Sequence, residues 1–83
     1  MANKPEIEIL YCAPCGYLPD ALNMLEKLLQ EYHAKLGKAS LVPGHGGAFE
    51  VSVNGKLVFS KLELGRFPDI KELREAVKTA TAA

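Results

Sequence analysis

EIEILYCAPCGYLPD, residues 6–20, leads from an alternating segment through two closely spaced cysteines to a proline. In EIEILYC (6–12) the isoleucines and Tyr11 share one side and the glutamates lie on the other, which predicts a half-buried strand. Pro19 predicts the first turn of a helix, because proline is tolerated there and disrupts a helix interior. The stretch therefore predicts a strand, a thiol-bearing loop and a helix in succession.

The first helix is expected over about residues 16–36. Asp20 suits the positive end of the helix dipole, and Gly37 is typical of a C-terminal cap. Apolar residues recur at intervals of three and four and form one predicted stripe. Its members are Leu18, Leu22, Leu25, Leu29, Tyr32 and Leu36.

The next part of the chain predicts three short strands. The pair NG (54–55) is the strongest short signal of a tight hairpin, so the strands on either side of it should be antiparallel. The strands are expected at 38–42, 48–53 and 56–62, with a PGHGG loop at 43–47 and a turn, ELGRF, at 63–67.

Pro68 is expected to open a second helix, and the final TATAA (79–83) to fray. Its predicted inner stripe is Ile70, Leu73, Ala76, Val77 and Ala80. Glutamate and serine on the second face of three strands place that face in water, so both helices should cover the other face. The sequence thus predicts an α/β fold of order β-α-β-β-β-α, a two-layer sandwich in which two helices lie on one face of a four-stranded mixed sheet.

Composition limits the classes of function. With 83 residues, 48% of them apolar, the chain predicts one domain over 1–83. Ten basic and ten acidic side chains cancel, so no basic surplus points to nucleic acid. No segment resembles a signal peptide or a membrane span, so a reducing cytoplasm and no membrane partner are expected. In that compartment a lone cysteine pair is typical of catalysis, redox sensing or metal binding.

The predicted topology gathers three loops at one edge of the sheet. The first two strands should be parallel, since a helix joins them, and the hairpin returns the fourth strand to the same edge. Loops 12–18, 43–48 and 63–67 would meet there, at the carboxyl edge where sites usually form. Cys15, and less so Cys12, should then lie at a helix N-terminus, which lowers a thiol pKa below about 8.5.

Several side chains at this edge are candidates for supporting the thiols. Pro14 restricts the turn between the cysteines and removes one backbone donor. His45 could accept a thiol proton, and Arg66 could stabilise a thiolate or bind a glutathione carboxylate, although solvated loop side chains are the alternative for both. Tyr17 and Phe67 would either form an apolar rim where a partner docks or close the end of the core.

Metal binding is the main alternative to redox exchange. One C-x-x-C motif supplies two ligands and a structural zinc site needs four. His45 could be a third ligand, and a dimer that shares two cysteine pairs could complete a site. We therefore expect no metal and no other cofactor within one chain, and the sequence leaves the oligomeric state open.

The chain contains EILYCAPCGYLP (8–19), GGAFEVSVNGKLVFS (46–60) and GRFPDIKEL (65–73). In this order and spacing they resemble the selenoprotein W-like (Rdx) family, over about residues 6–78. The resemblance implies a thioredoxin-like fold and a small thiol oxidoreductase that works with glutathione or a thioredoxin-type reductant on protein thiols. The competing class is a non-enzymatic module that binds a partner or a metal, with the cysteines as a redox-sensitive latch.

Two departures from related patterns affect the site. Both motif positions are cysteine, where family members carry either cysteine or selenocysteine. Thioredoxin has a cis-proline facing its motif, whereas this chain reads GHGGAF there, so the N–H groups of Gly46, Gly47 and Ala48 are candidates for holding substrate backbone. Thioredoxin-like chemistry favours Cys12 as the attacking thiol and Cys15 as the resolving one, whereas selenium at the second position in relatives favours the reverse. We expect both to be active and Cys12 to form the mixed disulfides with proteins.

Overall fold

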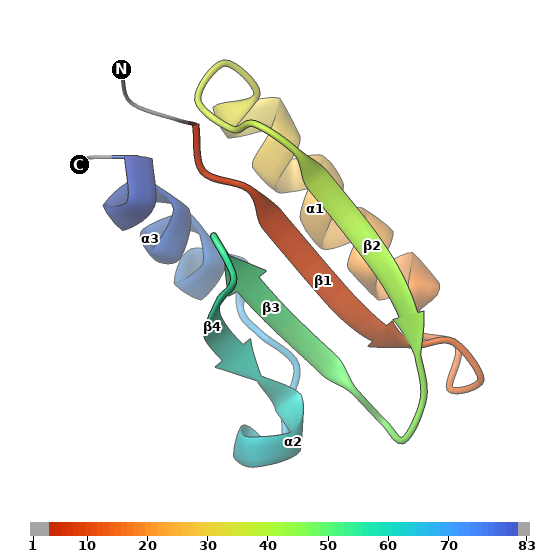
Figure 1. The fold of residues 1–83 in the computed structure, drawn as a ribbon. Helices are drawn as coiled ribbons and strands as arrows, with labels where there is room; N and C mark the ends of the chain where they lie inside the picture. The colour runs from red at the N-terminus through yellow and green to blue at the C-terminus, as the bar shows by residue number, and fades with distance from the viewer. Residues whose placement is uncertain (1–3, 82–83) are drawn as a thin grey trace.

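One mixed sheet of four strands forms the frame of the computed structural model, which describes residues 4–81 (Figure 1). The strands are β1 (Ile7–Cys12), β2 (Ala39–Gly44), β3 (Phe49–Val53) and β4 (Lys56–Ser60), and the helices are α1 (Leu18–Tyr32), α2 (Lys61–Leu64) and α3 (Ile70–Thr81). The strand order is β2-β1-β3-β4, in which β1 is parallel to β2 and antiparallel to β3. The predicted two-layer α/β architecture is confirmed, with α2 as an additional element.

The core lies between the sheet and the two longer helices. Figure 1 shows α1 and α3 on one face of the sheet, where α1 contacts β1 and β2, and α3 contacts β3 and β4. On β1, Ile7 and Ile9 are almost completely buried, whereas Glu8 is exposed between Ser40 and Ser52 of the neighbouring strands. Burial of each such isoleucine contributes about 1.5–3 kcal/mol, so the alternation alone strongly specifies which face of β1 packs.

The buried face of α1 differs from the predicted stripe. Leu18 and Leu22 are 40% and 50% exposed, while the fully buried positions are Ala21 and Leu28. Leu25 belongs both to the predicted stripe and to the buried face, and Leu29 and Tyr32 are partly buried. Leucines occur on several sides of α1, so hydrophobic spacing alone does not identify the face that contacts the sheet.

The boundaries of α1 and β2 also shift. α1 begins at Leu18 and ends at Tyr32, and the buried Leu36 lies beyond the helix. β2 runs to Gly44, since its parallel register with β1 pairs Cys12 with Gly44. Pro43 is tolerated in β2 because this strand lies at an edge of the sheet.

The NG hairpin is confirmed, but the strand after it is shorter than expected. Asn54 and Gly55 both have positive φ, 54° and 78°, as the tightest hairpin turn requires. β4 ends at Ser60, and residues 61–64, half of which were predicted as strand, form α2. The second long helix begins at Ile70, two residues after Pro68. Residues 79–81 continue α3, and 82–83 lie outside the described residues.

Candidate active site

Three loops meet at the carboxyl edge of the sheet, as predicted. β1, β2 and β4 all end there, because β4 runs antiparallel to β3 and therefore parallel to β1. Two backbone hydrogen bonds join the first two loops: Cys12 N–H donates to the Ala48 carbonyl at 2.7 Å, and Ala13 N–H to the Gly44 carbonyl at 3.0 Å. The cysteine loop is thus held directly by the end of β2 and by the residue that precedes β3.

The cysteine loop is a single turn closed by a glycine. Gly16 N–H donates to the Ala13 carbonyl at 3.1 Å and Tyr17 N–H to the Cys12 carbonyl at 3.3 Å, the pair of bonds that closes a Schellman motif. Gly16 has φ 79°, the left-handed conformation that this motif needs at that position. Pro14 sits in the turn, where its fixed φ suits the second position.

Cys12 and Cys15 form a disulfide within this turn, with an S–S distance of 2.03 Å and Cα atoms 5.3 Å apart. Their exposures differ: Cys12, at the end of β1, is 1% exposed, whereas Cys15 is an exposed loop residue. The predicted position at a helix N-terminus is wrong. α1 begins at Leu18 with Tyr17 as its N-cap residue, so Cys15 lies outside the first turn, where the dipole acts most strongly.

The two aromatic residues predicted at this edge are in contact. The Tyr17 and Phe67 rings lie 4.8 Å apart, edge to face, and Phe67 also contacts the buried Phe49 at 5.2 Å. Phe67 remains 38% exposed. It therefore closes one end of the core and also presents an apolar surface next to the cysteine loop.

Lys61 is a residue at this edge that sequence reasoning missed. Its Nζ atom lies 5.2 Å from the centre of the Tyr17 ring and 5.4 Å from that of Phe67, close enough for cation–π attraction to both. The sequence pattern predicted Lys61 inside the strand 56–62 and gave no reason to expect its side chain beside the Tyr17 and Phe67 rings. Its position follows from α2.

α2 is held by a partly buried polar network. Ser60 is its N-cap and accepts a hydrogen bond from the Glu63 N–H at 3.1 Å, while the Ser60 hydroxyl donates to the Glu50 carboxylate. Glu50 also accepts from the Lys61 N–H at 2.9 Å. A carboxylate from β3 thus satisfies donors at the start of a four-residue helix that is too short to be stable alone.

Arg66 has a partner other than the thiols. Its two terminal nitrogens donate to the two Glu72 carboxylate oxygens at 2.6 and 2.9 Å, and its guanidinium lies 5.4 Å from the Phe59 ring centre. The Arg66 hydrogen bond, with a second from the Asp69 N–H, lowers the pKa of Glu72 to about 2. Within residues 4–81 the side-chain hydrogen bonds of Arg66 go to Phe67 and Glu72, and none goes to the cysteine loop.

The loop between β2 and β3, which contains Gly46 and Gly47, is the third segment at this edge of the sheet. Gly46 and Gly47 both have positive φ, 73° and 79°, so the chain turns there through conformations that other residues avoid. His45 is exposed, and no side-chain hydrogen bond of His45 occurs within residues 4–81. Across the described part of the chain, no three histidine, cysteine or acidic side chains group as metal ligands, and no helix is long and apolar enough to cross a bilayer.

Comparison with known proteins agrees with this geometry. The Rdx family model matches residues 6–79. The chain belongs to the Rdx family. Among Rdx-related proteins it is similar to mouse selenoprotein W, with 36% identity over 92% of each chain. It is also 43% identical to mouse migration and invasion enhancer 1, over 90% of this chain, and spans 64% of that protein's length.

Solved structures show the same fold. A selenoprotein W-related protein from Vibrio cholerae superposes with a TM-score of 0.90 at 30% identity, over 95% of this chain and 99% of the other. A protein from Bordetella parapertussis gives 0.88 at 38% identity, over 93% and 98%. The fold of this Rdx-family chain is thioredoxin-like, and a Cys-x-x-Cys pair at bonding distance supports a redox-related role.

Proposed function

We propose that this Rdx-family chain carries out reversible thiol–disulfide exchange through Cys12 and Cys15. The observation that carries the proposal is the disulfide in an exposed turn, with one sulfur-bearing residue exposed and the other buried. Exchange needs a sulfur that a partner can reach and a second thiol held close enough to displace that partner. The Cys12–Cys15 turn supplies both.

The difference in exposure favours Cys15 as the first thiol to react, the reverse of the order expected from thioredoxin. The Cys15 thiolate attacks one sulfur of a substrate disulfide, so a mixed disulfide forms, the substrate S–S bond breaks and one substrate thiolate leaves and is protonated. The Cys12 thiol then loses its proton and attacks the Cys15 sulfur. The internal disulfide forms as the second substrate thiolate leaves, and two electrons have passed to the substrate.

The return half of the cycle needs a thiol reductant. We infer that glutathione or a thioredoxin-type protein in the cytoplasm supplies two electrons by the same steps in reverse, with attack at the sulfur of the exposed residue Cys15. The Tyr17–Phe67 surface and the N–H groups of Gly46, Gly47 and Ala48 are the proposed contacts for a protein substrate. They adjoin the loop that carries both cysteines.

Redox titration tests the proposal. Metal-free protein is equilibrated across a series of glutathione ratios, and free thiols are counted with a mass tag. We expect a reversible two-thiol transition at about −200 to −300 mV, and turnover when a reductant and a small disulfide are both supplied. A pair that never closes contradicts exchange; a pair that closes once without turnover supports the redox latch instead.

A further inference from the structure

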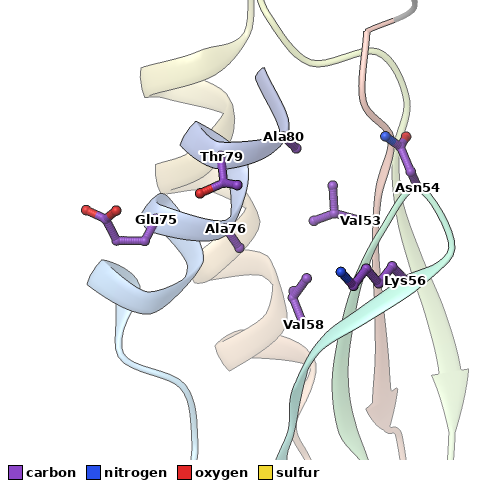
Figure 2. A pocket seen from close by; sticks show the side chains of 8 residues that line it. All are labelled: Val53, Asn54, Lys56, Val58, Glu75, Ala76, Thr79 and Ala80. Carbon is purple, nitrogen blue, oxygen red and sulfur yellow. The ribbon is translucent and has the colours of Figure 1, made fainter. Parts of the chain in front are cut away.

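A hollow lies at the end of the sheet opposite the cysteines. It is formed by the β3–β4 hairpin and the C-terminal half of α3 and has a volume of about 570 Å³ (Figure 2). Sites for small molecules span roughly 300–1,000 Å³. Val53, which lines the hollow, ends β3, whereas Phe49 at the start of β3 pairs with Tyr11 beside the cysteine loop. A ligand here would not touch the thiols.

The hollow exists because small residues face a distorted strand. α3 fills the core with Leu73 and Val77 but presents Ala76 and Ala80 to the hollow. On the opposite wall the pairing of β3 with β4 shifts register, so that Val58 has no partner in β3. Val58 is 38% exposed in the hollow, next to the buried Val53. The inner wall is therefore aliphatic and incompletely covered.

One cation faces this aliphatic wall. Figure 2 shows the Lys56 ammonium directed toward the hollow and the Glu75 carboxylate directed away from it, with Asn54 and Thr79 at the rim. Lys56 takes part in neither of the two ion pairs of residues 4–81. An aliphatic wall with one available ammonium group complements a molecule that has a hydrocarbon body and one negative end.

We propose that this hollow binds a small aliphatic carboxylate. The hydrocarbon chain packs against the four wall residues, Val53, Val58, Ala76 and Ala80, and the carboxylate pairs with Lys56. An alcohol of the same length would retain the apolar contacts and lose the ion pair. An ammonium of that length would be repelled by Lys56, so the three head groups separate the two contributions to binding.

The test is an amide NMR titration of the whole chain with octanoate, octan-1-ol and octylammonium. We expect octanoate to shift the resonances of the wall residues saturably and to leave those of Cys12 and Cys15 unchanged. Octan-1-ol should bind about two- to fivefold more weakly, the range that an exposed ion pair contributes, and octylammonium more weakly still. Equal affinities for the three ligands, or shifts at the cysteine loop only, would overturn the proposal.

Variants separate the wall from the cation. Ala76→Leu should fill the hollow and abolish saturable binding, and Lys56→Gln should remove the preference for octanoate over octan-1-ol. Lys71→Gln, an exposed lysine at the other end of α3, is the matched control and should change neither. If Lys56→Gln leaves the preference intact, or if the same shifts appear on protein concentration without ligand, a second copy or another contact occupies the hollow and the proposal fails.

Discussion

Cys12 and Cys15 belong to one turn, but their side chains meet different surroundings. Cys12 ends a central strand and is buried, whereas Cys15 lies in the exposed part of the turn. Cys12 lies between Tyr11 and Ala13 and Cys15 between Pro14 and Gly16, and these neighbours alone do not indicate which thiol is accessible. Burial distinguishes the two cysteines, because a reagent or substrate reaches an exposed cysteine more readily than a buried one.

This difference predicts unequal thiol reactivity. In Cys12→Ser the remaining Cys15 is exposed and should react quickly with iodoacetamide. In Cys15→Ser the remaining Cys12 is buried, and its reaction should be at least about tenfold slower. Mass spectrometry at timed intervals gives both rates for the folded proteins, and unfolding in urea should make them similar. Equal rates without urea would contradict the assignment of Cys15 as the accessible thiol.

Gly16 predicts a second effect at a single residue. Its φ is 79° and a Cβ atom there would meet nothing within 4 Å, so the cost of a side chain is conformational rather than steric crowding by neighbours. Gly16→Ala should lower the free energy of unfolding by about 1–2 kcal/mol. Gly16→Asn should cost less, because asparagine tolerates this conformation. Urea unfolding of the oxidised proteins measures both, and an unchanged Gly16→Ala protein would show that the turn relaxes.

At the level of whole elements, α2 is the part of the fold that depends most on a distant partner. Four residues cannot form a stable helix alone, and the Ser60 and Glu50 side chains satisfy its first donors. This short helix places Lys61 over the Tyr17 and Phe67 rings. The start of α2 thus connects β3 to the surface next to the cysteine loop.

Ser60→Ala removes the cap of α2 and one partner of the Glu50 carboxylate. We expect a loss of about 0.5–2 kcal/mol in the free energy of unfolding and faster hydrogen exchange at the Lys61 and Glu63 amides. Ser60→Thr keeps the hydroxyl group and should restore most of the protection. Hydrogen exchange followed by NMR reports each amide separately. Unchanged protection in Ser60→Ala would mean that Glu50 alone holds α2.

The start of α3 carries a pH-sensitive cap. Asp69 and Glu72 form a capping box: the Asp69 carboxylate accepts from the Lys71 N–H, and Glu72 accepts from the Asp69 N–H. Arg66 adds two further hydrogen bonds to the Glu72 carboxylate. These contacts favour the charged form of Glu72, whose pKa falls from 4.5 to about 2 on folding.

The direction of that shift determines the effect of acid. A group whose pKa is lowered in the folded state stabilises the protein above its unfolded pKa, and the contribution disappears as pH falls through the folded value. The difference in unfolding free energy between the parent protein and Glu72→Gln should therefore be constant above about pH 5 and shrink toward about pH 2. Urea unfolding across this range measures it. If this difference in unfolding free energy does not change with pH, the contact between Arg66 and the charged Glu72 is not its source.

For the whole molecule, most of the core does not involve the disulfide, although the Cys12 side chain is itself buried. The hydrophobic cluster that joins the sheet to α1 and α3 includes neither cysteine. The disulfide closes a very short loop, with a sequence separation of three, so it constrains the unfolded chain only modestly. The fold should therefore persist in both redox states, as an exchange protein requires.

Reduction should lower the free energy of unfolding by at most about 2 kcal/mol and leave the protein folded. Urea unfolding with and without a phosphine reductant measures the difference, and near-ultraviolet circular dichroism reports the packing of the aromatic residues. The double variant Cys12→Ser/Cys15→Ser is the control and should not respond to the reductant. Loss of tertiary structure on reduction would show that the disulfide is a structural staple and would argue against repeated exchange.

Patterns within a few residues were sufficient to predict β1, the NG turn, the second long helix and the order of the layers. Alternation, turn residues and helical spacing are local, and the connection of parallel strands through a helix then places the cysteines at the carboxyl edge. The buried face of α1, the existence of α2, the Glu72 partner of Arg66 and the exposure of each cysteine were not accessible in this way. Each depends on contacts between segments far apart in the chain, which hydrophobic spacing within one segment does not encode.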